Sequence, residues 1–86
     1  MPAISFFYGI IIRMFFADHA PPHFHAQYGD YKATISILDL KLIEGELPRR
    51  ALNLILDWAE LHQQELLDNW NRAANNEQLQ SIKPLE

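Results

Sequence analysis

Three of the four histidines in the chain lie in one short segment, FFADHAPPHFHAQYGD, together with two aspartates and two prolines. His23 and His25 are two residues apart, so on a β-strand both imidazoles would leave the same face. Two such histidines can chelate a divalent metal ion if a third ligand is supplied, and Asp18 or His19 could supply it. Imidazole and carboxylate ligands suit zinc, iron, nickel or manganese better than calcium. The segment therefore predicts a candidate metal site made by Asp18, His19, His23 and His25.

The same histidines support two other interpretations. In one, His23 and His25 are catalytic residues that move protons, while Arg13 holds an anionic group such as phosphate. The chain would then be a small enzyme, dependent on histidine or on a metal, that acts on a phosphodiester such as RNA. In the other, the histidines are only the polar residues that the solvent-facing side of an open sheet requires. The sequence leaves all three interpretations open.

The residues that carry the histidines predict a β-hairpin. HFHAQY and YKATISI both alternate between apolar and polar side chains, which is typical of half-buried strands. Gly29-Asp30 lies between them, and glycine at the first central position suits a two-residue type II′ turn. This turn predicts the cross-strand pairs Tyr28–Tyr31, Gln27–Lys32, Ala26–Ala33, His25–Thr34, Phe24–Ile35 and His23–Ser36. A slip by one residue would mix the two faces, so the register is well specified.

Two or three further strands are expected to flank this hairpin. GIIIRMFF alternates as well and predicts an antiparallel neighbour, which places Arg13 and Phe15 on the same face as His25. Its apolar set is Ile10, Ile12, Met14 and Phe16. Residues 4–7 could add a short edge strand, with Gly9 as a bend or bulge. LKLIEG is expected to form the last strand after a turn at Leu38-Asp39, with Leu40 and Leu42 facing inward.

From Pro48 to about Asn75 the apolar residues recur with the period of a helix. One straight helix of this length would measure ~40 Å at 1.5 Å per residue, which is longer than the small sheet. A bend near His62-Gln63 is therefore expected, and residues 76–86 are expected to dock weakly through Leu79 and Ile82. The sequence thus predicts one α+β domain over residues 1–86. An antiparallel meander of about four strands (about 4–43) is covered on one face by a long or bent C-terminal helix (about 48–75).

Composition narrows the classes of function. The chain has 86 residues, no cysteine and a formal net charge of −4, so disulfides, thiolate metal sites and cysteine catalysis are excluded. The acidic balance does not favour a nucleic-acid partner, because such proteins usually present a basic face. The apolar run ISFFYGIIIRMFF is interrupted by Gly9 and Arg13 and is too short to span a bilayer, so we expect a cytoplasmic protein. A core this small often supplies only ~3–5 kcal/mol, which makes a homo-oligomer a natural expectation.

Three stretches of the chain, ISFFYGIIIRMFF, DHAPPHFHAQYGDY and LPRRALNLILDWAELHQQELLDNW, resemble a family of short bacterial proteins, domain of unknown function 4160. The resemblance runs from Pro2 to Leu85 and is most specific at PPHFHA and LPRRAL. It implies an interaction component of a two-gene module that resembles a toxin–antitoxin pair, with a protein partner encoded nearby. The partner would bind the second half of the helix or the polar face of the sheet. Asp18, His19, Pro22, His23 and His25 match positions of the family motif, which carry no assigned role.

Overall fold

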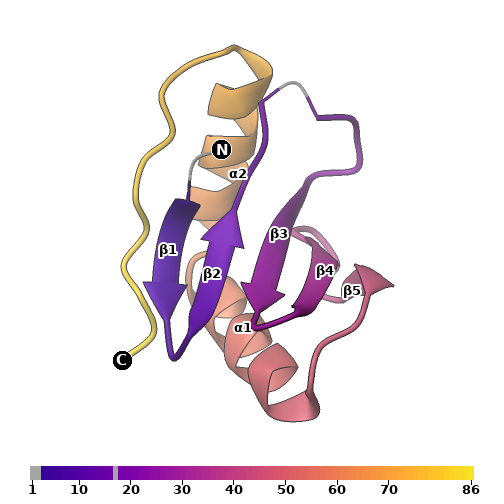
Figure 1. Ribbon diagram of the computed structural model, residues 1–86. Helices are drawn as coiled ribbons and strands as arrows, with labels where there is room; N and C mark the ends of the chain where they lie inside the picture. The colour runs from indigo at the N-terminus through magenta and orange to yellow at the C-terminus, as the bar shows by residue number, and fades with distance from the viewer. Residues whose placement is uncertain (1–2, 17) are drawn as a thin grey trace.

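Five antiparallel strands form one meander sheet in the computed structural model, which describes residues 3–16 and 18–86 (Figure 1). The strands are β1 (Ala3–Phe7), β2 (Ile10–Arg13), β3 (His23–Tyr28), β4 (Tyr31–Ser36) and β5 (Leu42–Gly45). Their order in the sheet is their order in the chain. The α+β meander expected from the sequence is confirmed, and residues 3–7 do form the additional edge strand.

Two tight turns set the register of β1 with β2 and of β3 with β4. Gly29 has a φ of 58°, as the first central position of a type II′ turn requires. All six expected pairs between β3 and β4 are present, from Tyr28↔Tyr31 to His23↔Ser36. Tyr8 and Gly9 join β1 to β2 with φ angles of 50° and 77°, so Gly9 belongs to a two-residue turn with positive φ at both positions.

Two apolar residues do not lie where alternation places them. Phe16 was expected on the apolar face, but β2 ends at Arg13 and the Phe16 side chain is 43% exposed. Leu40 was expected in the last strand, but it has a φ of 51° in the preceding turn, and β5 begins at Leu42. Met14 is buried in the core as expected, Leu40 still packs against the core from its turn, and Leu42 is half-buried.

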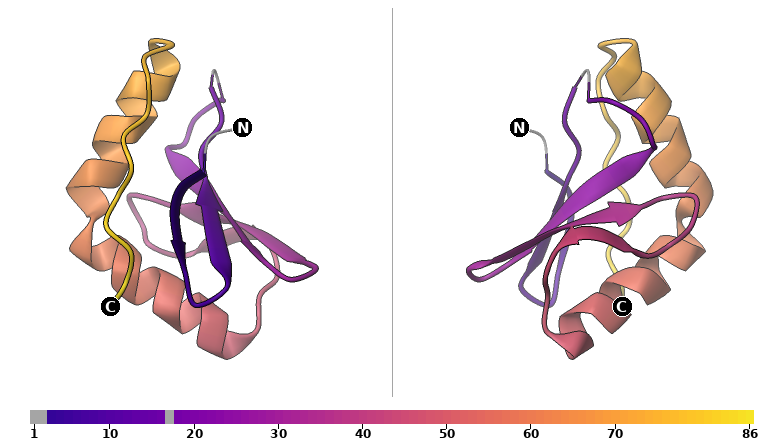
Figure 2. Two further views of the ribbon diagram at one scale, coloured as in Figure 1. Left: turned by 60° about the vertical axis from the view of Figure 1, so that its left-hand side comes forward. Right: turned by 90° about the vertical axis from the view of Figure 1, so that its right-hand side faces the viewer.

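Two helices form a second layer that covers one face of the sheet (Figure 2). They are α1 (Arg49–Leu61) and α2 (Gln63–Ala74), separated at His62, so the expected bend is present. Gln63 fixes the start of α2 by donating its side-chain amide to the Ile37 carbonyl at 2.7 Å. Among the described residues, no helix is both long and apolar enough to cross a bilayer.

The core lies between these layers and leaves the other face of the sheet uncovered. Trp58 is completely buried and packs against Phe7 and Phe24, with ring centroids 5.2 and 5.9 Å away. The two layers contribute most of the other core side chains, and the C-terminal tail adds one: Ile4, Ile10, Ile12, Met14, Ala26, Ile35, Ile37, Ala51, Ile55, Ala59, Leu66, Ala73 and Ile82. Their one-sided distribution keeps Arg13, His25 and Thr34 on the open face, where they are only half-buried.

The C-terminal tail, residues 77–86, runs in an extended path along β1 and the helices (Figure 1). Ile82 is buried, and its backbone N–H donates to the Ile4 carbonyl at 2.8 Å. The indole N–H of Trp58 donates to the Lys83 carbonyl at 2.8 Å. The tail is thus held by hydrogen bonds in addition to the expected apolar anchors at Leu79 and Ile82.

Candidate functional site

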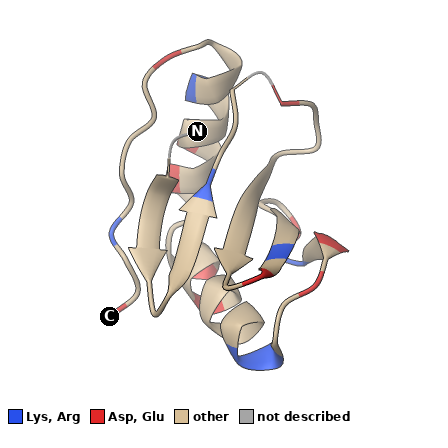
Figure 3. Ribbon diagram, in the orientation of Figure 1, with Lys and Arg blue, Asp and Glu red and all other residues tan. Residues whose placement is uncertain are grey.

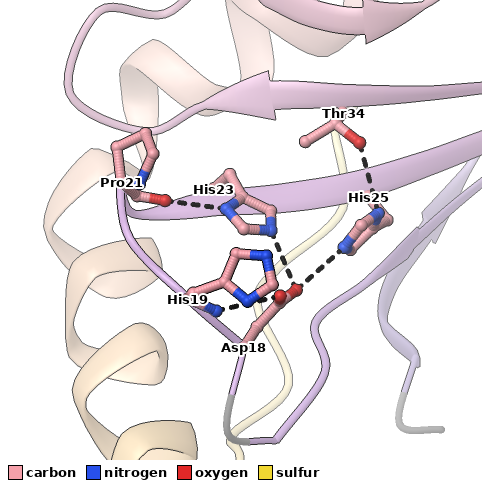
Figure 4. A network of polar contacts seen from close by, with 6 residues as sticks. All are labelled: Asp18, His19, Pro21, His23, His25 and Thr34. Atoms are coloured by element: carbon pink, nitrogen blue, oxygen red, sulfur yellow. Dashed lines mark hydrogen bonds and ion pairs between the residues drawn. The ribbon is translucent and has the colours of Figure 1, made fainter.

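One carboxylate oxygen lies between two imidazoles at the start of β3 (Figure 4). Oδ2 of Asp18 is 2.8 Å from Nε2 of His23 and 3.3 Å from Nε2 of His25. The two imidazole rings are 5.1 Å apart and nearly perpendicular. The three ligand atoms all lie within 4.8 Å of one another, a spacing at which they could hold a single metal ion. We call Asp18, His23 and His25 the trio.

Both ring nitrogens of His23 face hydrogen-bond acceptors. Nδ1 is 2.7 Å from the carbonyl oxygen of Pro21, which can only accept, so Nδ1 carries a proton. Nε2 then points a lone pair at the Asp18 carboxylate unless it too binds a cation. The side chain is almost fully enclosed, because residue His23 is only 8% exposed and its ring lies 5.0 Å from that of Trp70 in α2. The interpretation of His23 as a solvent-facing residue of the sheet is therefore wrong.

His25 is more open than His23 and is oriented by two neighbours on the sheet. Its Nδ1 lies 3.4 Å from the hydroxyl of Thr34, the cross-strand partner expected from the turn. The ring of Phe15 packs against it with a centroid distance of 4.2 Å. Its side chain remains 29% exposed. His25 is thus the member of the trio that a small molecule in solution could reach.

The surroundings of Asp18 favour its charged form. Burial alone would raise the pKa of the carboxyl group, but hydrogen bonds from His25, from His23 and from the backbone N–H of His19 outweigh this effect. The charge that His23 can carry acts in the same direction, so the pKa of Asp18 lies below its ordinary value of 3.8. Oδ1 accepts the His19 N–H at 3.0 Å, which leaves Oδ2 to the imidazoles.

The structure separates the predicted site residues into three groups. It brings Asp18, His23 and His25 together, while His19 is exposed and contributes its backbone to Asp18. Arg13 is the cross-strand neighbour of His25, as the matched faces required, and its guanidinium donates to Oε1 of Gln27 at 2.7 Å. Arg13 therefore lies beside the trio on the open face, held by a residue of β3.

A pocket of about 310 Å³ opens on the uncovered face of the sheet, with His25 in its lining. Besides His25, its polar side chains are Arg13, Gln27, Lys32, Thr34 and Glu44, and its apolar ones include Ile11 and Phe15. A volume near ~300 Å³ is at the lower end of the range for small-molecule sites. The trio therefore stands at the edge of a cavity that could admit a small ligand.

Two features of the site could not be read from the local pattern. Trp70 closes over His23 from a segment 47 residues away in the chain, and only the excess length of the helix over the sheet hinted at such a contact. The Pro21 carbonyl fixes the Nδ1 proton of His23, and its direction depends on the loop between β2 and β3. Alternation predicts which face a strand residue takes, but it says nothing about a preceding loop.

The chemical capacity of the trio follows from its ligand set. Two imidazoles and one carboxylate are a recurrent protein set for zinc and for non-haem iron. With three protein ligands, such a centre keeps at least one position for water or substrate. His23 also has the hydrogen bond from its other ring nitrogen to a backbone carbonyl that metal-ligating histidines commonly make.

Comparison with known proteins identifies a family to which the chain is similar. Neither the curated proteins nor the solved structures yield a match to it. The family model of the domain of unknown function DUF4160 matches residues 9–71, which include the trio, the hairpin and most of both helices. Because the match covers more than half of the sequence, the chain belongs to the DUF4160 family.

Proposed function

We propose that the trio binds a divalent transition metal and that the protein is a small hydrolytic enzyme built around that centre. The observation that carries the proposal is the arrangement of His23. Its Nδ1 donates to the Pro21 carbonyl, while its Nε2 faces Oδ2 of Asp18 at 2.8 Å. A cation must lie near Nε2 to make this contact favourable, and that cation is either a proton or a metal ion.

The second imidazole favours the metal ion over the proton. Nε2 of His25 approaches the same carboxylate oxygen, so three potential ligand atoms converge on one point. The Thr34 hydroxyl can accept a hydrogen bond from Nδ1–H of His25, and in that tautomer Nε2 is free to ligate. One metal ion would satisfy both imidazole contacts at once, whereas without it His23 would need a second proton and His25 would need its own N–H on Nε2.

Hydrolysis is the reaction that such a centre supports without a further cofactor. A divalent ion with an open position lowers the pKa of a bound water to about 7 and so supplies hydroxide at neutral pH. The protein would contribute the fixed ligands, the enclosure by Trp70 and Phe15, and the adjoining pocket for the substrate. Besides the substrate, the reaction then needs only water.

Titration of metal-free protein with zinc, followed by calorimetry, tests the proposal. We expect one equivalent to bind near neutral pH. His23→Ala and His25→Ala should each weaken binding by more than ~100-fold, since even the loss of an outer hydrogen-bond partner costs ~10–100-fold. His19→Ala and His62→Ala are the matched controls and should bind zinc as the unaltered protein does, because neither side chain belongs to the trio.

Failure of zinc, cobalt, nickel, manganese and ferrous iron to bind would overturn the metal proposal. A proton would then be the cation between His23 and Asp18. The interpretation in which His23, His25 and Arg13 act as acid–base and anion-binding residues would be the one to pursue.

A second candidate is the interaction component of a cytoplasmic two-gene module. Exposed aromatic residues favour it, because Phe6 and Tyr8 in and after β1 are 62% and 58% exposed. The inner face of α2 is already occupied by the core, by His23 and by the tail, so the partner would bind the open sheet face. Co-expression with the neighbouring gene product tests this role. Phe6→Ser with Tyr8→Ser should abolish co-purification, whereas Leu61→Ser, at another exposed apolar residue, should not.

A further inference from the structure

We infer that the pocket on the open face of the sheet binds an organic phosphate ester, with the phosphoryl group at Arg13 and the apolar part on Ile11 and Phe15. The inference deepens the proposed function, because it names the substrate class of the same site. Binding itself needs only the sheet residues, so it can be tested without a metal.

Strand register arranges the residues of the open face in two parallel rows. One row crosses the sheet as Arg13, His25, Thr34 and Glu44, from β2 to β5. The next row crosses it as Phe6, Ile11, Gln27 and Lys32, from β1 to β4. Gln27 accepts a hydrogen bond from Arg13 across these rows at 2.7 Å. The guanidinium is therefore fixed beside His25 at one end of the pocket.

The chemistry of Arg13 selects an oxyanion. A guanidinium has five N–H donors in a planar fork, and the Gln27 contact leaves others free to pair with two oxygens of one phosphoryl group. Among the residues that the structure describes, no carboxylate lies within ion-pairing distance of Arg13. Gln27 thus holds the guanidinium in place without neutralising its charge.

Charge along the pocket defines which end receives the anion. Figure 3 shows the basic residues of β2 and β4 in blue and the acidic residue of β5 in red. Glu44 in β5 is three strand spacings from Arg13 in β2, or about 14 Å at ~4.8 Å per strand. Lys32 in β4 and Glu44 in β5 both line the pocket away from Arg13. The end that contains Arg13 and His25 also holds the Asp18 carboxylate, but Oδ2 of Asp18 faces the two imidazoles of the trio. Among the described residues the Arg13 guanidinium has no ion-pair partner, so it is the group at this end that can receive an anion.

The remaining lining explains why an organic ester fits better than inorganic phosphate. Ile11 is half-buried between Phe6 and Gln27 in its row, and Phe15 packs on the His25 ring. Both line the pocket and offer apolar surface next to Arg13. A flat apolar group, such as an aryl ring or a nucleobase, would cover this surface while its phosphoryl group reaches Arg13. His25 would then bring the trio next to the ester bond.

Calorimetric or NMR titration of metal-free protein with phenyl phosphate tests the inference. We expect saturable binding that is tighter than that of inorganic phosphate or of phenol, since each of these lacks one half of the ligand. Arg13→Gln should weaken binding by about tenfold or more, because hydrogen bonds to charged groups are among the stronger ones. Arg13→Lys should lose less affinity than Arg13→Gln, since lysine keeps the positive charge and lacks only the planar fork of N–H donors.

Matched variants separate this inference from the metal proposal. Arg50→Gln, at an exposed position of α1 on the other side of the sheet, should leave phenyl phosphate binding unchanged. Metal-free protein should bind phenyl phosphate with the same affinity whether or not zinc binds in a separate titration, because the pocket side chains make the contact. If zinc fails to bind but Arg13→Gln still weakens the binding of phenyl phosphate, the metal proposal is wrong and the phosphate site is supported.

Two results would overturn the inference: no saturable binding of phenyl phosphate to the unaltered protein, or equal binding by folded Arg13→Gln and Arg13→Lys variants and the unaltered protein. A parallel titration with bis(4-nitrophenyl) phosphate identifies the subclass of ester. Tighter binding of the diester would support a phosphodiester substrate, and tighter binding of phenyl phosphate a phosphomonoester.

Discussion

The two oxygens of Asp18 have different partners, and this division organises the candidate site. Oδ1 is held by the backbone N–H of His19, so the carboxylate cannot rotate freely, and Oδ2 is directed at both imidazoles. Each imidazole is in turn oriented through its other nitrogen, His23 by a carbonyl and His25 by a hydroxyl. These outer contacts differ in strength, since the carbonyl contact is 2.7 Å and the hydroxyl contact is 3.4 Å.

The hydroxyl of Thr34 can be removed without changing any residue of the trio. Thr34→Val keeps the shape of the side chain and deletes the hydroxyl, so Nδ1 of His25 loses its partner on the sheet. We expect zinc affinity to fall by ~10-fold, at the low end for outer-shell partners, because this hydrogen bond is long. Thr34→Ser retains the hydroxyl and should restore most of the affinity in the same calorimetric titration. Equal zinc affinity of the valine and serine variants would show that Thr34 does not orient His25.

The lowered pKa of Asp18 predicts how the metal-free fold responds to acid. A carboxyl group whose pKa is lower in the folded than in the unfolded protein stabilises the fold at pH values above its unfolded pKa. That contribution is lost as the pH falls from about 3.8 through the lower folded value. Asp18→Asn should therefore lose less stability than the unaltered protein between pH 6 and pH 2.5, as measured by urea unfolding in the presence of a chelator. A larger loss in Asp18→Asn would contradict the direction of the shift.

At the scale of the elements, the pairing of β4 with β5 is one of two irregular pairings in the sheet, the other being that of β1 with β2. The register shifts between Thr34 and Ile35, and the chain enters β5 through Leu40 at a φ of 51°. At the other end of β5, Gly45 has a φ of 83° and lies against β4 so closely that an added Cβ would be 2.2 Å from the Lys32 carbonyl oxygen. This glycine permits the close approach that brings Glu44 and Lys32 to one end of the pocket.

Two glycine substitutions separate this close approach from the cost of a positive φ alone. Gly29→Ala also places a side chain at positive φ, but nothing lies within 4 Å of its Cβ, so we expect a loss of about 1–2 kcal/mol in unfolding free energy. Gly45→Ala adds a backbone clash to the same strain. This variant should lose more unfolding free energy than Gly29→Ala, or fail to fold. Chemical denaturation of both variants makes the comparison. An equal loss in the two would show that β5 can move away from β4 at little cost.

The elements that could be predicted from the sequence are those with a local physical signal. The alternation of β3 and β4 with glycine in the turn specifies all six cross-strand pairs, and the length of the helical pattern specifies a bend at His62. Leu40 carries no such signal, because its positive φ is imposed by the surrounding turn and no glycine marks it. The same holds for the site. The placement of Arg13, His25 and Thr34 follows from register, whereas the Trp70 contact depends on the packing of two distant segments.

At the scale of the whole molecule, the fold is closed by segments at or beyond the ends of the region that the family shares. The family match begins at residue 9 and ends at residue 71, so it omits β1 and the tail. Yet Ile4, Phe7 and Ile82 are all part of the core. The tail also satisfies Trp58 and Asn69, whose side chains are buried and donate to the Lys83 and Gln80 carbonyls. Without the tail, two buried polar groups and the edge of β1 would lose their partners.

This closure predicts that a single methylene group in the tail affects the stability of the whole domain. Ile82→Val should lower the unfolding free energy by about 0.5–1.5 kcal/mol, and Ile82→Ala by about 2–5 kcal/mol, because the residue is only 4% exposed. A domain with a core this small has a total of only ~3–5 kcal/mol, so the alanine variant should lose most of its stability. Gln78→Ala, in the exposed part of the tail, should change the stability by less than ~0.5 kcal/mol. Urea unfolding monitored by tryptophan fluorescence, which senses Trp58, measures all three. A stable Ile82→Ala variant with the same fluorescence maximum as the unaltered protein would show that residues 9–71 and β1 hold the core without the tail.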